Sequence, residues 1–184
     1  MRAIKDYFII LKIKAGDTDA WEELVNKYYE SIFHYCRRRF FGNESLAEDL
    51  TQEIFLKVIR SIDSYRFTGK FFNYLFTIAV NTCNDFSQKK KLDEVALENI
   101  EQIATNSFDT EKWLVEELQD TIQFALNQLS QQQREAILLK FYYGMKVKEI
   151  AAITDTSIPT TQSRINQGLT KMKRLLNKED IYFD

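Results

Sequence analysis

The stretch 145–176, MKVKEIAAITDTSIPTTQSRINQGLTKMKRLL, has the pattern of a helix, a tight turn and a second helix. Apolar residues recur at helical spacing in its first part, and residues 155–157 interrupt that pattern. Ser157 is a favourable N-cap, and Pro159 falls in the first turn of the second helix, where its missing N–H costs nothing. The stretch therefore predicts a helix-turn-helix.

The second helix of this stretch has two contrasting faces. The apolar face is predicted to be buried and comprises Ile158, Ile165, Leu169, Met172 and Leu176. The other face carries hydrogen-bonding and cationic side chains and no carboxylate: Ser157, Thr160, Ser163, Arg164, Gln167 and Lys171. A helix that enters the major groove needs such a face, because bases offer donors and acceptors and phosphates repel carboxylates. A solvated amphipathic helix has the same spacing, so the rest of the chain must decide.

Composition predicts an all-α protein. The chain has 184 residues, with only five glycines and one proline to build hairpins. We expect two small helical domains joined by an acidic linker, the second ending in the helix-turn-helix. No apolar run approaches the ~18 residues that span a bilayer. The only apolar core near the N-terminus, residues 7–11, is short and is followed by lysines, so we expect no signal peptide, no membrane insertion and a cytoplasmic location.

Charge is unevenly distributed along the chain. Residues 1–91 hold 15 basic and 12 acidic residues, residues 92–120 hold one and nine, and residues 121–176 hold eight and three. Two basic segments on either side of an acidic connector suit two nucleic-acid modules. We therefore predict a first domain over 1–91, a linker over 92–110 and a second domain over 111–184.

Helical periodicity and capping residues predict the individual elements. The predicted helices cover 17–41, 44–62, 70–91, 111–128 and 130–143, followed by the two helices of the helix-turn-helix. Ser130 is the predicted N-cap of the fifth of these helices, and Gly144 is predicted to end it.

The sequence offers no residues for catalysis or metal binding. His34 is the only histidine, Cys36 and Cys83 are the only cysteines, and no metal-ligand spacing or phosphate-binding loop occurs. We therefore expect no enzyme activity, no catalytic residue, no metal and no cofactor, and two buried, reduced thiols.

Residues 47–59, AEDLTQEIFLKVI, predict a helix with a buried apolar stripe and an outward stripe of a different kind. The outward stripe consists of Asp49, Gln52, Glu53 and Leu56. An exposed leucine ringed by polar groups suits a protein-docking surface. An ordinary acidic solvent face with one leucine is equally consistent with the spacing.

The predicted helix 70–91 carries an uncharged polar row on one flank: Asn73, Thr77, Asn81, Asn84 and Gln88. Short amides and hydroxyls are weak helix formers, but they can pair with the edges of unstacked bases. Phe72, Tyr74 and Phe76 are candidates for base stacking. The loop 63–70 before this helix holds Tyr65, Arg66 and Phe67, which could hold an extruded base or cap the core.

Taken in order, several segments resemble one family. They are AGDTDAWEELVNKYYESIF (15–33), AEDLTQEIFLKVI (47–59), FTGKFFNYLFTIAVN (67–81), LSQQQREAILLKFYYGMKVKEIA (129–151) and SIPTTQSRINQGLTKMKRLL (157–176). Their order resembles a bacterial sigma factor of the extracytoplasmic-function (ECF) class. The resemblance implies that the outward stripe of Asp49, Gln52, Glu53 and Leu56 docks on the β′ clamp helices of core RNA polymerase. It also implies that the loop 63–70 and Asn81 recognise the melted −10 promoter element, and that the helix from Ser157 recognises the −35 element.

The resemblance further implies partners. They are core RNA polymerase (the β′ clamp helices and the β flap), promoter DNA, and a membrane-linked anti-sigma factor that covers both domains. The alternative from the residues alone is a stand-alone helix-turn-helix regulator that binds DNA as a dimer. That alternative leaves the polar row of 70–91 and the outward stripe of 47–59 without a role.

Overall fold

The computed structural model describes residues 2–67, 70–94 and 110–179, and these form helices and turns without a strand. The first four helices are α1 (Arg2–Lys14), α2 (Asp19–Arg39), α3 (Glu44–Ser61) and α4 (Phe71–Glu94). A 3-10 turn at Ile62–Ser64 opens the loop before α4. The predicted helices 17–41, 44–62 and 70–91 are thus confirmed, with ends that differ by at most three residues.

The second half contains α5 (Thr110–Asn127), α6 (Gln131–Ile137), α7 (Val147–Ile153) and α8 (Ile158–Glu179). One predicted helix, 130–143, is divided: α6 ends at Ile137 and a π-helical segment, Leu138–Tyr142, completes it. Ser130 caps α6 in a capping box with Gln133, as predicted. The predicted linker 92–110 lies mostly outside the described residues, because α4 continues to Glu94 and α5 begins at Thr110.

Helix α1 is not among the predicted helices. The helix buries Ile9, Ile10 and Ile13 in the same core as α2 and α3. The three isoleucines share a helical face, which is the periodicity that indicates the helix. No helix among the described residues is long and apolar enough to cross a membrane.

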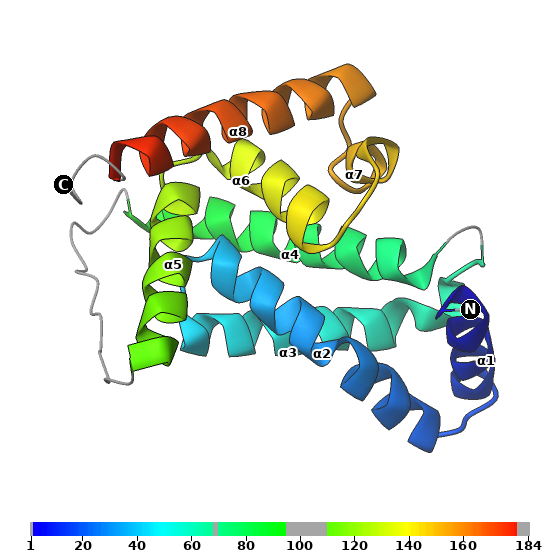
Figure 1. Cartoon of the computed structure of the whole chain (residues 1–184). Coiled ribbons are helices and arrows are strands. Elements are labelled where there is room, and N and C mark those ends of the chain that lie inside the picture. The colour runs from blue at the N-terminus through cyan, green and yellow to red at the C-terminus, as the bar shows by residue number, and fades with distance from the viewer. Residues whose placement is uncertain (1, 68–69, 95–109, 180–184) are drawn as a thin grey trace.

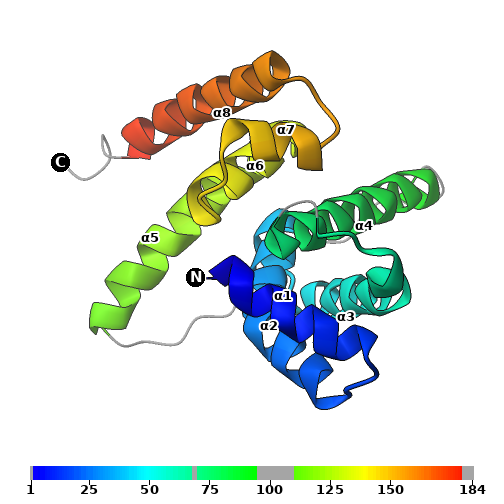
Figure 2. The same cartoon turned by 90° about the vertical axis from the view of Figure 1, so that its right-hand side faces the viewer.

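The helices form two groups, shown in Figures 1 and 2. We call α1–α4 the first bundle and α5–α8 the second bundle. Within the first bundle, α3 buries Ala47, Leu50, Ile54 and Val58 against α2 and α4, as the spacing predicted. The second bundle lies against α4, with α7 beside it in both views. One continuous apolar core runs through both bundles.

The helix-turn-helix has the predicted turn. Ser157 Oγ accepts a hydrogen bond from the backbone N–H of Thr160 and so caps α8. Asp155 has a φ of 49°, a left-handed conformation that aspartate tolerates better than most residues. Gly144, with a φ of 63°, ends the preceding π-helical segment, also as predicted.

The buried face of α8 differs from the predicted face. Ile165 is buried, but Ile158 and Leu169 are 54% and 40% exposed, and Thr161 and Gly168 are buried in their place. Thr161 can be buried because its hydroxyl donates to the Ser157 carbonyl. A Cβ on Gly168 would lie 2.9 Å from Ile137 Cγ1, so glycine permits the close approach of α8 to α6. The outward face of α8 is therefore rotated toward Gln162 and Asn166.

Candidate nucleic-acid interface

The outward stripe of α3, made of Asp49, Gln52, Glu53 and Leu56, is called the α3 face from here on. Asp49, Gln52 and Glu53 are exposed, and Leu56 is 51% exposed. Ile59, which lies outside the predicted set, is 45% exposed one turn further along. Leu56 and Ile59 together give the surface a larger apolar centre than one leucine would provide. Glu53 Oε1 lies 3.0 Å from Lys57 Nζ, so one carboxylate of the polar rim is ion-paired within α3.

The loop 63–70 presents only part of its predicted binding set. Arg66 and Phe67 are exposed, whereas Tyr65 is 8% exposed and packs against Phe71 and Tyr74. In this conformation Tyr65 caps the core, the alternative role proposed for the loop aromatics. Residues 68 and 69 lie outside the described residues.

Helix α1 holds this loop in place. Lys14 Nζ donates to the backbone carbonyls of Asp63 and Tyr65, at 2.9 and 2.8 Å. The Tyr7 and Phe67 rings pack with their centroids 4.5 Å apart. The loop that the resemblance assigns to promoter contact is therefore fixed at both its backbone and its aromatic tip.

The polar row on α4 is divided by the second bundle. Asn81 and Gln88 are exposed, whereas Asn73 and Asn84 contact the second bundle. Thr77 donates its hydroxyl to the carbonyl of Asn73 in its own helix. Phe76 is fully buried, so it is not available to stack with bases in this structure, and Phe72 and Tyr74 are half-buried. The row is thus open at Asn81 and Gln88 and covered by the second bundle at Asn73 and Asn84.

Glu149 of α7 makes the contact at Asn73. Its carboxylate accepts hydrogen bonds from Lys70 Nζ at 2.9 Å and from Asn73 Nδ2 at 3.2 Å. It also accepts from the backbone N–H of Lys146 at the start of α7, and these hydrogen bonds lower the pKa of Glu149 to about 2. A cavity of about 410 Å³ lies beside the contact, between the loop 63–70, α4 and α7. A carboxylate thus holds two side chains of the candidate −10 surface.

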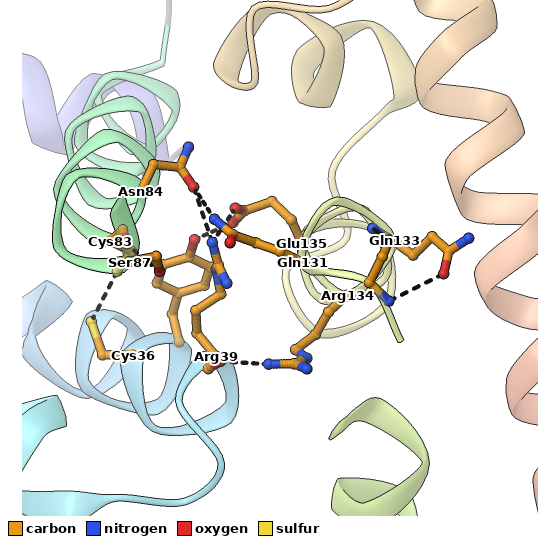
Figure 3. Close-up of polar contacts among 11 residues, drawn as sticks. Cys36, Arg39, Cys83, Asn84, Ser87, Gln131, Gln133, Arg134 and Glu135 are labelled. Carbon is orange, nitrogen blue, oxygen red and sulfur yellow. Dashed lines mark hydrogen bonds and ion pairs between the residues drawn. The ribbon is translucent and has the colours of Figure 1, made fainter. Parts of the chain in front are cut away.

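A second contact between the bundles is buried. We call the inter-bundle network the set formed by Tyr35, Arg39, Asn84, Gln131 and Glu135 (Figure 3). Glu135 accepts the hydroxyl proton of Tyr35, and its other oxygen lies 3.3 Å from Arg39 Nη2. Asn84 Oδ1 accepts from Arg39 at 3.0 Å and from Gln131 at 2.9 Å.

The inter-bundle network places charges where water is excluded. Tyr35, Arg39 and Glu135 are each at most 4% exposed. Burial raises the pKa of the Tyr35 phenol well above its ordinary value, and the Glu135 charge raises it further. One buried donor of the network, Arg39 Nε, has no hydrogen-bond acceptor within the described residues. Packing the two bundles together removes this donor from water without a replacing hydrogen bond, which costs free energy.

A neighbouring arginine extends the contact between the bundles. Arg134 Nη1 donates to the backbone carbonyl of Arg39, and its guanidinium lies 4.5 Å from the centroid of the Phe41 ring. Burial and the nearby Arg39 charge lower the pKa of Arg134 to about 10. Tyr143 also crosses between the bundles, donating its hydroxyl proton to the Ser31 carbonyl.

Helix α8 presents a candidate base-contacting face. Thr160, Ser163 and Gln167 are exposed, and Gln167 accepts from Gln133 of α6. Arg164 and Lys171 are half-buried on the flank, and Lys171 donates to the Gln128 carbonyl. The exposed face also includes Gln162, Asn166 and Thr170, which the predicted set omitted because the predicted buried face was displaced. The Glu149 carboxylate of α7 is bonded to Lys70 and Asn73, and among the described residues no ion pair joins it to Arg164.

Among the residues that the structure describes, no three histidine, cysteine, aspartate or glutamate side chains form a group that could hold a metal ion. Cys36 and Cys83 are free and buried, with their sulfurs 4.0 Å apart. Burial raises the pKa of the Cys83 thiol well above its ordinary value, so the thiol stays protonated.

The amino-acid sequence matches one protein family. The sigma-70 region 2 model matches residues 24–92, and the sigma-70 region 4 model matches residues 119–172. The ECF RNA polymerase sigma factor SigW of Bacillus subtilis is 33% identical over 177 residues, which cover 91% of this chain and 94% of SigW. The ECF RNA polymerase sigma-E factor of Escherichia coli K12 is 29% identical, covering 88% of this chain and 89% of that protein.

Solved structures share the fold. CnrH in complex with the cytosolic domain of CnrY aligns with a TM-score of 0.67 at 22% identity, covering 93% of this chain and 96% of that chain. The sigma factor RpoE of Bartonella quintana, in complex with the anti-sigma factor NepR, aligns with a TM-score of 0.65 at 24% identity. That alignment covers 85% of this chain and 96% of that chain.

The chain belongs to the ECF class of the sigma-70 family of RNA polymerase sigma factors. Members of this family are transcription initiation factors that direct core RNA polymerase to promoters. The two region matches and the near full-length relatives favour this function over a dimeric helix-turn-helix regulator, which would use the second bundle alone.

Proposed function

We propose that the chain acts in the cytoplasm as a non-catalytic sigma subunit, with its DNA-binding surfaces divided between the two bundles. The α3 face binds the β′ clamp helices, and the second bundle binds the β flap. Arg66, Phe67, Asn81 and their neighbours on the loop and the polar row bind the melted −10 element. The outward face of α8 binds the −35 element.

The proposal rests on a contrast between the two candidate DNA-binding surfaces: the outward face of α8 is exposed, whereas the polar row on α4 is covered in part. Helix α8 lacks exposed carboxylates from Thr160 to Arg174 and is open to a major groove. The polar row is covered at Asn73 and Asn84 by the second bundle. In the free protein the −10 surface is therefore masked in part, at Asn73 and Asn84. Binding of core polymerase to the α3 face and to the second bundle would separate the bundles and uncover these two residues.

The proposal includes an anti-sigma factor, linked to the membrane. In the solved complexes CnrH is bound to the cytosolic domain of CnrY and RpoE is bound to the anti-sigma factor NepR, and both sigma chains share this fold. A partner that holds the two bundles together would prevent the separation that promoter binding requires.

Run-off transcription tests the proposed function. Purified protein and core RNA polymerase are incubated with fragmented genomic DNA of the source organism, and the 5′ ends of the transcripts are mapped. We expect start sites that share a −35 and a −10 sequence. A gel shift with and without core polymerase accompanies it, and promoter-specific binding by the free protein as a dimer would overturn the proposal.

Asn81→Ala should reduce promoter opening more than initial binding. Asn81 is the exposed amide at the centre of the polar row, and an unpaired base becomes available to it only after melting. Loss of one hydrogen bond should reduce the open fraction about fivefold. Permanganate reactivity measures opening, and a gel shift at low temperature measures initial binding.

The matched control for Asn81 is Asn26→Ala, which removes an exposed amide from α2. It should leave both steps unchanged. An Asn81→Ala holoenzyme that opens the promoter normally, or one that loses only initial binding, would remove Asn81 from the melted-strand contact.

Arg164→Ala should weaken all promoters alike. Arg164 is half-buried on the flank of α8, whereas Ser163 points outward, so we assign Arg164 to a phosphate rather than a base. Removing one phosphate contact should lower the slope of log affinity against log salt by about one unit. Binding to a promoter panel at several salt concentrations measures this slope. A change of preference at one base position, with the slope unchanged, would instead assign Arg164 to a base edge.

A further inference from the structure

Helix α1 is apolar on two faces, although a helix at a protein surface normally exposes polar residues on its outer side. One face, Ile9, Ile10 and Ile13, is buried in the first bundle. The other face carries Tyr7, Phe8 and Leu11, which are 42%, 58% and 40% exposed. Three adjacent large apolar side chains, two of them aromatic, mark a surface that has a partner.

The charges around this outer face favour an anionic partner. Lys5, Lys12 and Lys14 of α1 are exposed. The single carboxylate of α1, Asp6, is 5% exposed and is neutralised by Lys27, whose Nζ lies 2.5 Å from Asp6 Oδ1. The outer face of α1 therefore combines aromatic rings with a cationic rim, the combination that binds unpaired nucleic acid.

The same face is continuous with the loop 63–70. The Tyr7 ring packs on the Phe67 ring at 4.5 Å, and Tyr7 and Phe8 lie edge to face at 5.7 Å. Lys14 Nζ lies 5.8 Å from the centroid of the Phe67 ring. Three aromatic rings thus extend from the tip of the loop onto α1, and Asp63 is the exposed carboxylate at the edge of this surface.

We propose that Tyr7, Phe8 and Phe67 form a stacking surface for unpaired promoter bases, beyond those held by the loop and the polar row. The inference rests on the proposed function, because only a protein that opens promoters presents a single strand to the loop 63–70. The rings bind the faces of the bases, which is tolerant of sequence, and the lysines bind the phosphates. This surface would prolong the life of the open complex without adding to promoter preference.

The test measures the lifetime of complexes between holoenzyme and a promoter whose −10 region is pre-opened by mismatches. A Tyr7→Ala, Phe8→Ala double variant should dissociate on the order of 10-fold faster after a heparin challenge. Phe8→Trp should keep the wild-type lifetime, because it keeps the ring. Phe124→Ala, which removes a 50% exposed ring from α5, is the matched control and should have no effect.

Abasic nucleotides identify the stacked positions. Each unpaired nucleotide is replaced in turn, and at a stacked position the abasic template should shorten the wild-type lifetime but not that of the double variant. Phe8→Ala alone supplies a milder change, so the same comparison with the wild type can be made if the double variant misfolds. Equal lifetimes for the variant and the wild type on the intact bubble would overturn the proposal.

Two further outcomes distinguish base stacking from a protein contact at α1 and from failure of the proposed function. If the double variant loses affinity for core polymerase by the same factor, α1 is a protein contact and the proposal is wrong. If the wild-type holoenzyme makes no promoter-specific transcript, the proposed function itself fails. A wild-type holoenzyme that transcribes and an α1 variant of unchanged lifetime reject only the stacking surface.

Discussion

Glu135→Ala should release the second bundle from the first. Glu135 is buried and is the shared partner of Tyr35 and Arg39. Its removal leaves the Arg39 charge buried and without its carboxylate, which costs about 3–5 kcal/mol when a buried pair is broken. Moving the bundles apart returns Arg39 to water, so the variant should relieve this cost by separating them rather than by unfolding.

The separation can be measured directly. Fluorescent labels on the exposed positions Asn26 of the first bundle and Asn166 of the second report the distance between bundles, and circular dichroism reports helicity. We expect a longer distance at unchanged helicity for Glu135→Ala. Asp120→Ala removes an exposed carboxylate from α5 and should keep the wild-type distance. An unchanged distance in a folded Glu135→Ala protein would show that the network does not hold the bundles together.

The same variant should change DNA binding by the free protein. Separation uncovers Asn73 and Asn84 of the polar row, which the second bundle covers in the wild type. A single-stranded −10 oligonucleotide should therefore bind the free variant more tightly than the free wild type. In holoenzyme, where core polymerase has already separated the bundles, the two proteins should bind the same oligonucleotide alike.

Local patterns predicted the helices because the information they need is local. Ser130 and Ser157 cap helices through bonds to residues three positions away, and Gly144 and Asp155 adopt the left-handed conformations that end helices. The apolar spacing within residues 47–59 predicted the buried stripe of α3. Helix α1 was not predicted because the short apolar core 7–11 was interpreted only as evidence against a signal peptide, although Ile9, Ile10 and Ile13 carry the helical spacing.

The error on α8 has a specific physical cause. Hydrophobicity alone placed Ile158 and Leu169 in the core and left Thr161 and Gly168 out of it. In the structure Thr161 is buried because its hydroxyl is satisfied within its own turn, and Gly168 is buried because α6 approaches too closely for a side chain. Both effects depend on a neighbouring element, so a single-helix pattern cannot contain them.

The sequence predicted which residues make up the candidate site but not which of them the rest of the protein covers. Residues of the α3 face are exposed as expected, and the outward part of α8 is exposed in a rotated form. The masking of Asn84 and the burial of Tyr35, Arg39 and Glu135 could not be predicted. Tyr35 and Glu135 are 100 residues apart, and neither has a local pattern that indicates the other.

The α3 face should carry a large share of the affinity for core polymerase. Leu56 is 51% exposed at its centre, with Asp49 exposed nearby and neither contributing to the buried stripe of α3. Truncating an apolar anchor at the centre of an interface costs about 2 kcal/mol or more, and rim charges mainly affect the rate of association. An Asp49→Ala, Leu56→Ala double variant should therefore bind core at least about 30-fold more weakly.

Competition with a labelled wild-type sigma subunit for limiting core polymerase measures this loss. Asn26→Ala removes an exposed side chain from α2 of the same bundle and should leave the affinity for core unchanged. Adding Ile59→Ala to the double variant should weaken binding further, because Ile59 continues the same apolar centre. Since all of these side chains point away from the core of the first bundle, the variants should keep wild-type helicity and thermal stability. Wild-type affinity in a folded double variant would mean that another face of the first bundle contacts polymerase, and the exposed pair Leu56 and Ile59 would then need a different partner.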